Sequence, residues 1–215
     1  MRENPSMMSH SREEQFRSAL LGWAEGNLRD FAWRDTDRSL YEVFVAEFFL
    51  TQTPAGNVAE IYPEFLERFP DLRAINAATE EEIVAVIEPL GFYNMRSEAL
   101  KSIAAERSEL PEDVEELTEL PRVGQYVANA TLCFSRGHRL PILDRNVERV
   151  YSRVFGADWP ESTSEQFDFA ERLLPTDDPR TYNLALLDFG AAICQPDPLC
   201  EQCFANDYCK YYETL

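Results

Sequence analysis

Lysine is nearly absent from this chain of 215 residues, which has only Lys101 and Lys210. Acidic residues outnumber basic ones by 39 to 20, so the formal net charge at pH 7 is -19. Such an excess normally argues against a nucleic-acid partner, because the phosphate backbone attracts cations. The acidic residues are spread along the chain rather than gathered in one tail. This pattern favours a solvated acidic surface suited to high salt, as in halophilic proteins, with ordinary solubility as the alternative.

Long apolar runs are missing as well. No run of roughly 18 apolar residues is present to span a membrane, and residues 1–11 are polar, without the apolar core of a signal peptide. The sequence therefore predicts a cytoplasmic protein that does not enter a membrane, and we expect it to act as a monomer.

Alternating runs long enough to predict a sheet are also missing, and apolar residues recur with the helical period instead. Residues 40–50 are apolar nearly all round, which indicates a helix buried on most sides. Capping boxes are expected at Thr79 with Glu82 and at Ser162 with Glu165. The sequence thus predicts an all-α fold. Its helices are expected from about Phe16 to Gly26, over 40–50, 55–68 with a kink at Pro63, 80–88, 95–107 and 182–194, and after Gly124, Asp144 and Ser162.

A short hairpin separates two of these helices. Gly124 follows Leu120–Val123 and opens an apolar helical run, so a tight turn presents backbone N–H groups at a helix N-terminus. Such a turn binds phosphate. Further along, Asp144 precedes another apolar helical run and occupies its N-cap position.

The same region is locally basic. Between residues 122 and 153, six arginines stand against two acidic residues, which gives a local charge of +4. This segment therefore predicts one basic face on an acidic body. Such a face can bind nucleic-acid phosphates, because cations neutralise them. The arginines are Arg122, Arg136, Arg139, Arg145, Arg149 and Arg153.

Four of the five cysteines form a C-x5-C-x2-C-x5-C array, whereas Cys133 lies alone in an apolar helix, where cysteine is usually a small core residue. Four thiols so close together in an intracellular protein indicate a metal site rather than disulfides. Structural zinc commonly uses two C-x2-C knuckles and only one is present, so an iron–sulfur cluster fits better, with zinc and paired disulfides as alternatives. The array consists of Cys194, Cys200, Cys203 and Cys209.

Three segments, LPRVGQYVANATLCF, PILDRNVERVYSR and YNLALLDFGAAIC, precede the cysteine array in this order. From about residue 28 to residue 211 the chain resembles the helix-hairpin-helix DNA glycosylase superfamily (HhH-GPD), in its iron–sulfur branch with endonuclease III, adenine glycosylase and thymine mismatch glycosylase. The resemblance implies base excision repair on double-stranded DNA that contains a mismatched or damaged base. It implies a two-lobed, endonuclease III-like fold, with a six-helix barrel over 38–145 and a discontinuous domain of 1–37 plus 146–215. It also implies a [4Fe-4S] cluster on the four cysteines, although the first cysteine loop is one residue shorter than usual.

Two carboxylates are candidates for the chemistry. Cleavage of an N-glycosidic bond builds positive charge on the deoxyribose, which a nearby carboxylate stabilises. Asp144 matches the family's catalytic aspartate, and a helix-capping role is compatible with this. Glu47 matches a glutamate that acts on the leaving base or on water, and its apolar neighbours would raise its pKa by desolvation. The alternative is that Glu47 faces solvent.

Position 126 predicts the reaction type. Glycosylases that also act as lyases carry a lysine there, which forms a Schiff base with the sugar, but this chain has Tyr126. The resemblance therefore implies a monofunctional glycosylase without strong lyase activity. Tyr126 is expected to stack on the extruded base or to close its pocket, and ordinary core packing is the alternative.

DNA contacts are expected from three segments. Gln52, in the sequence FLTQT, matches the family loop that fills the gap left by the extruded nucleotide. Arg122 stands where the family usually has the glycine of LPGVG, which permits close backbone approach, so an arginine could add a phosphate contact instead. The DNA-binding residues implied by the resemblance are Gln52, Leu120, Arg122, Val123, Gly124, Gln125, Arg145 and Asn146.

The substrate is inferred from smaller similarities. Tyr126, the segment TPAG at 53–56, YNLALLDFGAAIC and a chain that ends soon after the cysteines resemble the thymine mismatch enzyme, which predicts excision of thymine or uracil opposite guanine. The segment NVERVYSR resembles adenine glycosylases, which makes excision of adenine from A·G or A·8-oxoG an alternative. Those enzymes normally add a C-terminal domain, for which no residues are expected here. A non-catalytic DNA-binding or redox-sensing cluster protein is the third alternative, and the presence of both Asp144 and Glu47 argues against it.

Overall fold

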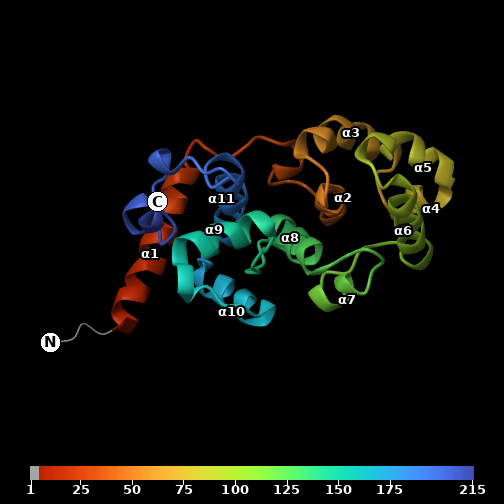
Figure 1. The fold of residues 1–215 in the computed structure, drawn as a ribbon. Helices are drawn as coiled ribbons and strands as arrows, with labels where there is room; N and C mark the ends of the chain where they lie inside the picture. The colour runs from red at the N-terminus through yellow and green to blue at the C-terminus, as the bar shows by residue number, and fades with distance from the viewer. Residues whose placement is uncertain (1–4) are drawn as a thin grey trace. The chain divides into compact units, whose positions relative to one another are not determined.

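The computed structural model describes the backbone of residues 5–215 and the side chains of residues 12–215. Helices joined by loops make up this part of the chain, which contains no strand, so the predicted all-α class is confirmed (Figure 1). The α-helices are α1 (Pro5–Ala24), α2 (Leu40–Leu50), α3 (Ala55–Arg68), α4 (Leu72–Ala77), α5 (Glu80–Ile87), α6 (Tyr93–Glu106), α7 (Val114–Thr118), α8 (Gln125–Arg136), α9 (Arg145–Phe155), α10 (Thr163–Leu173) and α11 (Pro179–Ala192). The 3-10 helices are η1 (Ala32–Arg34), η2 (Glu88–Leu90), η3 (Gly156–Asp158), η4 (Cys200–Gln202), η5 (Asn206–Tyr208) and η6 (Tyr212–Thr214).

None of the described helices is both long and apolar enough to cross a membrane. The polar segment 1–11, for which we predicted no signal peptide, lies partly outside the described residues.

The predicted helices are found with shifted ends. α6 begins at Tyr93 rather than Met95. α11 begins at Pro179 rather than Tyr182, because Asp178 caps it and proline is favoured in the first turn of a helix. The helices α4 and α7 were not predicted, since six and five residues are too few to show a helical period.

The caps agree with the sequence in part. Thr79 and Glu82 form the predicted capping box at α5. Ser162 caps α10 by accepting from the N–H of Glu165, but its hydroxyl also donates to the Glu165 carboxylate at 2.5 Å. The prediction of a full capping box there is therefore wrong, because that carboxylate does not reach back to the backbone. Ser39 opens α2 with a capping box that was not predicted.

The chain divides into two compact units. The central unit is Asp30–Arg136, and the terminal unit joins the segment that ends at Arg29 to Gly137–Leu215. This division places Glu47 and Tyr126 in the central unit and Asp144 in the terminal unit. The predicted domain boundaries, 38–145 and 1–37 plus 146–215, stay a prediction.

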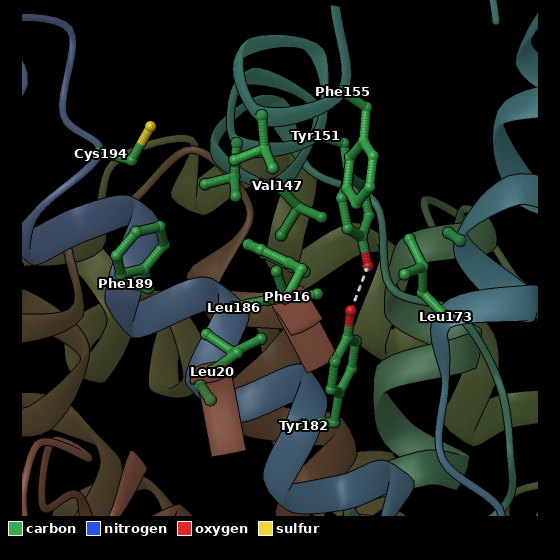
Figure 2. Close-up of a cluster of buried hydrophobic side chains, with 14 of the residues drawn as sticks. Phe16, Leu20, Val147, Tyr151, Phe155, Leu173, Tyr182, Leu186, Phe189 and Cys194 are labelled. Carbon is green, nitrogen blue, oxygen red and sulfur yellow. Dashed lines mark hydrogen bonds between the residues drawn. The ribbon is translucent and has the colours of Figure 1, made fainter. Parts of the chain in front are cut away.

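The terminal unit is built around an aromatic core from α1, α9, α10 and α11 (Figure 2). Phe16 contributes a fully buried ring in edge-to-face contact with Tyr151. The hydroxyls of Tyr151 and Tyr182 lie 3.4 Å apart and share a hydrogen bond inside this core. Burial raises the pKa of both tyrosines, because the core disfavours the phenolate. The core fixes α9, the helix that Asp144 precedes.

In the central unit, α2 is the most buried helix, as its apolar composition predicts. Its residues Val43–Phe49 are all buried, and it packs against α3 and α8. Aromatic contacts continue from α2 into α3, where the rings of Phe49 and Phe65 meet edge to face at 4.9 Å. This core holds α8 against the helix that carries Glu47.

Candidate active site

Glu47 and Tyr126 meet inside the central unit. Glu47 lies on α2 and is only 2% exposed, so the alternative that it faces solvent is wrong. Tyr126 lies in the first turn of α8, and its hydroxyl donates a hydrogen bond to Glu47 Oε2 at 3.1 Å. A buried carboxyl group needs such a partner, because desolvating an unpaired one is costly. Two residues predicted to be catalytic are thus brought into contact across 79 positions of sequence.

Asp144 is held at the start of α9 in the terminal unit. Its Oδ1 accepts hydrogen bonds from the backbone N–H of Asn146 at 2.9 Å and of Val147 at 2.8 Å, so the predicted N-cap is confirmed. Its Oδ2 accepts from the side-chain amide of Asn146 at 3.1 Å. Asp144 is half-buried. The carboxylate is therefore fixed in direction by three donors at the positive end of a helix dipole.

A chain of hydrogen bonds links this carboxylate to the first cysteine of the array. Arg149 donates to Asn146 Oδ1 at 2.8 Å, to the carbonyl of Gly190 at 3.0 Å and to the carbonyl of Cys194 at 2.8 Å. A side chain at Gly190 would lie 3.1 Å from Asn146 Cβ, so glycine permits this close packing. The role of Arg149 was not predicted: its spacing from Asn146 on one helix is visible in the sequence, but its carbonyl partners, Gly190 on α11 and Cys194 just after α11, are not.

The hairpin offers its backbone rather than apolar side chains. Leu120 and Val123 are buried, and the Val123 N–H donates to the Leu120 carbonyl at 3.1 Å. Gly124 and Gln125 are exposed, and no acceptor among the described residues takes their N–H groups. The Gln125 side chain donates to Asn129 at 2.8 Å. The turn therefore presents two backbone donors at the N-terminus of α8, the arrangement that binds phosphate.

Arg122 adopts the backbone conformation that favours glycine. Its φ of 64° lies in the left-handed region, where a Cβ is disfavoured. Its Nη2 lies 3.1 Å from the Met95 sulfur, so the guanidinium turns toward α6. The hairpin thus keeps the shape that a glycine would give it, with an arginine in place.

Gln52 and Arg122 share the rim of one cavity of about 300 Å³ in the central unit. Gln52 is exposed just after α2 and is a second non-glycine residue in the left-handed region, with φ 59°. The remaining lining residues are Phe48, Thr51, Phe92, Met95 and Arg96. The structure therefore brings together two predicted DNA contacts from separate loops.

The predicted basic face is smaller than the sequence suggests. Arg136 forms an ion pair with Glu112 at 2.6 Å, and Arg139 forms one with Glu171 at 3.1 Å. Arg153 donates to the carbonyls of Gln195 and Pro196, and Arg149 is used as described above. Four of the six arginines thus bind acidic residues or backbone carbonyls of their own unit. Arg145 is exposed and has no partner among the described side chains.

The four cysteines of the array line one cavity in the terminal unit, together with Arg153, Phe189 and Tyr211. All five cysteines are free, so the disulfide alternative is wrong. No three histidine, cysteine or acidic side chains among those described lie close enough to hold a single metal ion. The four thiols therefore line one cavity, but among the described residues they do not form a group that could hold a metal ion.

Comparison with known proteins identifies the family. Residues 45–175, more than half of the chain, match the HhH-GPD superfamily base excision DNA repair protein. The chain is 32% identical over 214 residues to the thymine/uracil-DNA glycosylase of Methanothermobacter thermautotrophicus, covering 95% of this chain and 96% of that protein. It is 36% identical over 193 residues to the adenine DNA glycosylase of Mycolicibacterium smegmatis, covering 86% of this chain and 65% of that protein. The solved structure of a thermostable thymine-DNA glycosylase is similar over 96% of this chain and 99% of that one, with a TM-score of 0.91 and 32% identity. The helical fold and these matches together show that the chain belongs to the HhH-GPD superfamily of base excision DNA repair proteins.

Proposed function

We propose that this protein is a monofunctional DNA glycosylase that removes thymine or uracil opposite guanine. The observation that carries the reaction type is the hydrogen bond from Tyr126 to the buried Glu47, because it fills with a phenol the position at which a lyase needs an amine. The substrate follows from the whole-length similarity to a thymine/uracil-DNA glycosylase.

In this proposal Asp144 stabilises the sugar. As the glycosidic bond breaks, positive charge grows on the deoxyribose ring, and an oriented carboxylate lowers the energy of that transition state. The three hydrogen bonds to Asp144 are made before DNA arrives. No reorganisation is then needed at the moment of reaction.

Glu47 donates or accepts the proton in this proposal. A carboxyl group at this position can protonate the departing base or, once ionised, accept a proton from the attacking water. The Tyr126 hydroxyl orients that carboxyl group. The aromatic ring of Tyr126 stacks on the extruded base. Because no amine joins the sugar, water completes the reaction and the abasic strand stays uncut.

Binding is assigned to the backbone donors of Gly124 and Gln125 and to the exposed Arg145, all directed at phosphates. Gln52 fills the gap left by the extruded nucleotide. Since four of the six arginines between residues 122 and 153 are used inside their own units, we expect affinity to depend mainly on these few contacts.

The four cysteines fit a [4Fe-4S] cluster, because they are free and line one cavity. Four thiolates are the usual donors of such a cluster, which spreads them over a wider cage than one zinc ion does. When bound, the cluster would cross-link the loop 194–209 through iron–thiolate bonds. Purified protein should contain roughly four irons and four sulfides per chain. One zinc and no sulfide would contradict this part of the proposal.

The activity is tested with end-labelled duplexes that contain G·T, G·U, A·G or A·8-oxoG, at several salt concentrations and with alkaline cleavage of abasic products. We expect cleavage of the G·T and G·U strands only after alkali. Borohydride should trap no covalent adduct, and an adduct at substantial yield would contradict the monofunctional assignment.

Adenine excision is the second candidate, since the chain is also 36% identical to an adenine DNA glycosylase. The chain spans 65% of that relative's length, against 96% for the thymine/uracil enzyme. The same panel separates the two: product from A·8-oxoG but not from G·T would favour the adenine enzyme.

A further inference from the structure

Arg96 is a buried cation without a carboxylate partner. It lies on α6 in the central unit, is only 5% exposed and forms no ion pair among the described residues. Burial lowers the pKa of its guanidinium. Such a group is stable only if its hydrogen-bond donors are satisfied. Nothing in the proposed chemistry uses it.

The two arms of this guanidinium hold two separate loops. Nη2 donates to the carbonyls of Phe49 at 3.0 Å and Thr51 at 2.7 Å and to the hydroxyl of Thr53 at 2.9 Å. Nη1 donates to the carbonyls of Leu90 and Gly91, both at 3.0 Å. One planar group therefore ties the end of α2 to the loop that leads into α6.

Each of the two guanidinium nitrogens donates to the carbonyl just before a residue in the left-handed region. The Thr51 carbonyl precedes Gln52, with φ 59°, and the Gly91 carbonyl precedes Phe92, with φ 50°. Because φ describes rotation relative to the preceding carbonyl carbon, anchoring that peptide limits the rotation. Non-glycine residues in this region are strained and persist only where the surroundings hold them.

Both held residues stand on the rim of the 300 Å³ cavity, and Arg96 lies in its lining. Phe92 is 53% exposed, which is unusual for a large aromatic side chain. The loop tips are thus presented to solvent while their backbones are fixed from beneath by a single side chain.

We propose that Arg96 is a positioning residue that sets the two tips, Gln52 and Phe92, at a fixed separation before DNA binds. A pre-set pair avoids the entropic cost of ordering two loops during base extrusion. The inference rests on the proposed function only in assigning these tips to the DNA-facing side.

The control is a second cation on the same helix. Lys101 donates to the carbonyls of Ile75 at 3.3 Å, Asn76 at 2.8 Å and Ala78 at 2.6 Å, away from the cavity. Lys101→Met removes a comparable set of cation–carbonyl bonds from α6. Arg96→Gln removes the charge and the fork, and Arg96→Lys keeps the charge without the fork.

The first measurement is residue-resolved amide hydrogen exchange of the free protein by NMR. The N–H of Thr53 donates to Leu50 and that of Gly91 to Glu88, so each reports on one loop. In Arg96→Gln both amides should exchange roughly tenfold faster, while Ala78, which donates to Ala74, should not change. Lys101→Met should reverse this pattern. Unchanged exchange at Thr53 and Gly91 in Arg96→Gln would overturn the proposal.

The second measurement follows extrusion without chemistry. In an Asp144→Asn background, a G·T duplex with 2-aminopurine beside the thymine should fluoresce more strongly on binding, as stacking is lost. Arg96→Gln should reduce the extruded fraction roughly tenfold, Arg96→Lys should fall between it and the parent, and Lys101→Met should match the parent. Equal extrusion by Arg96→Gln and Lys101→Met would show a merely structural role and sink the positioning role. Absence of excision by wild-type protein would count against the proposed function, while the exchange experiment would still decide whether Arg96 braces the two loops.

Discussion

The two carboxylates of the proposed chemistry, one in each unit, are held in opposite ways. Glu47, in the central unit, is buried and contacts the hydroxyl of Tyr126. Asp144, in the terminal unit, is half-buried and accepts three hydrogen bonds from its own helix start. One carboxyl group is enclosed beside a phenol, and the other is fixed in direction at the start of a helix. Pairs of acids with such divergent surroundings are a recurring way to divide acid and electrostatic roles.

The largest effect is expected from Asp144→Asn. Asparagine is as good an N-cap as aspartate, so the fold should be preserved while the negative charge beside the sugar is lost. Single-turnover excision from G·T should fall roughly 10³-fold with nearly unchanged duplex affinity. Asp178→Asn is the matched control, because Asp178 caps α11 by accepting from Thr181 N–H in the same unit. Equal activity of Asp144→Asn and the control would remove the catalytic assignment.

Glu47→Gln tests the other side of the comparison. Glutamine has the same shape but cannot transfer a proton, so excision should fall roughly 10²-fold. Tyr126→Phe should have a smaller effect, and the double variant should be less impaired than the two losses multiplied, because the residues act together. Glu42→Gln, on the same helix but paired with Arg38, is the control and should retain activity. If the fold-losses of the two single variants multiply in the double variant, Tyr126 does not act through Glu47.

The terminal unit has its own buried hydroxyl contact, between Tyr151 and Tyr182. Their pKa values are raised by burial from the usual 10, so the folded state keeps them protonated. Above pH 10 the unfolded state releases these protons more readily, and stability is lost as pH rises. In Tyr151→Phe the free energy of unfolding should fall less steeply with pH, by up to about 1.4 kcal/mol per pH unit, measured by urea unfolding between pH 10 and 11. Tyr93→Phe, at a half-exposed position, should leave the slope as it is in the wild type; a common slope for all three proteins would contradict the prediction.

Arg149→Gln breaks the link between Asp144 and the cysteine array while leaving the helix cap in place. Asn146 loses its partner at 2.8 Å and can turn away from the carboxylate. Excision should fall roughly tenfold with unchanged duplex affinity, as is typical when a residue that orients a functional group is removed. The exposed neighbour Glu148 provides the control as Glu148→Gln. A fall in affinity rather than rate would assign Arg149 to DNA binding instead.

Features that depend on neighbouring residues could be predicted from the sequence, whereas contacts between distant segments could not. The cap at Asp144 uses partners two and three residues away, so a local pattern was enough to find it. The contact between Tyr126 and Glu47 joins two helices far apart in sequence, and only the resemblance to a known family pointed to both residues. The use of Arg136, Arg139 and Arg153 within the fold depends on tertiary partners, and counting their charges overestimated the basic face.

Backbone strain was equally hidden from the sequence. Nothing in the segments around Gln52 and Phe92 indicates left-handed backbone, and only the glycine usual at the hairpin hinted at it for Arg122. The sequence does not distinguish Arg96 from the other polar residues of its helix, because its burial is set by the loops folded over it. Short helices such as α4 were missed for a related reason, since tertiary packing rather than periodicity stabilises them.

Arg122→Gly should give the smallest effect and concerns stability. Glycine removes the steric strain at φ 64° but increases the entropy of the unfolded chain, so the net gain should be modest. Arg122→Ala keeps a Cβ and loses the same guanidinium, which makes it the matched control. We expect Arg122→Gly to exceed Arg122→Ala in unfolding free energy by about 1 kcal/mol, measured by urea denaturation at neutral pH. Both variants lose the contact to Met95, so the difference isolates the backbone. If alanine proved equally stable, the hairpin would have to relax at no cost, and the central unit would not store strain at this rim.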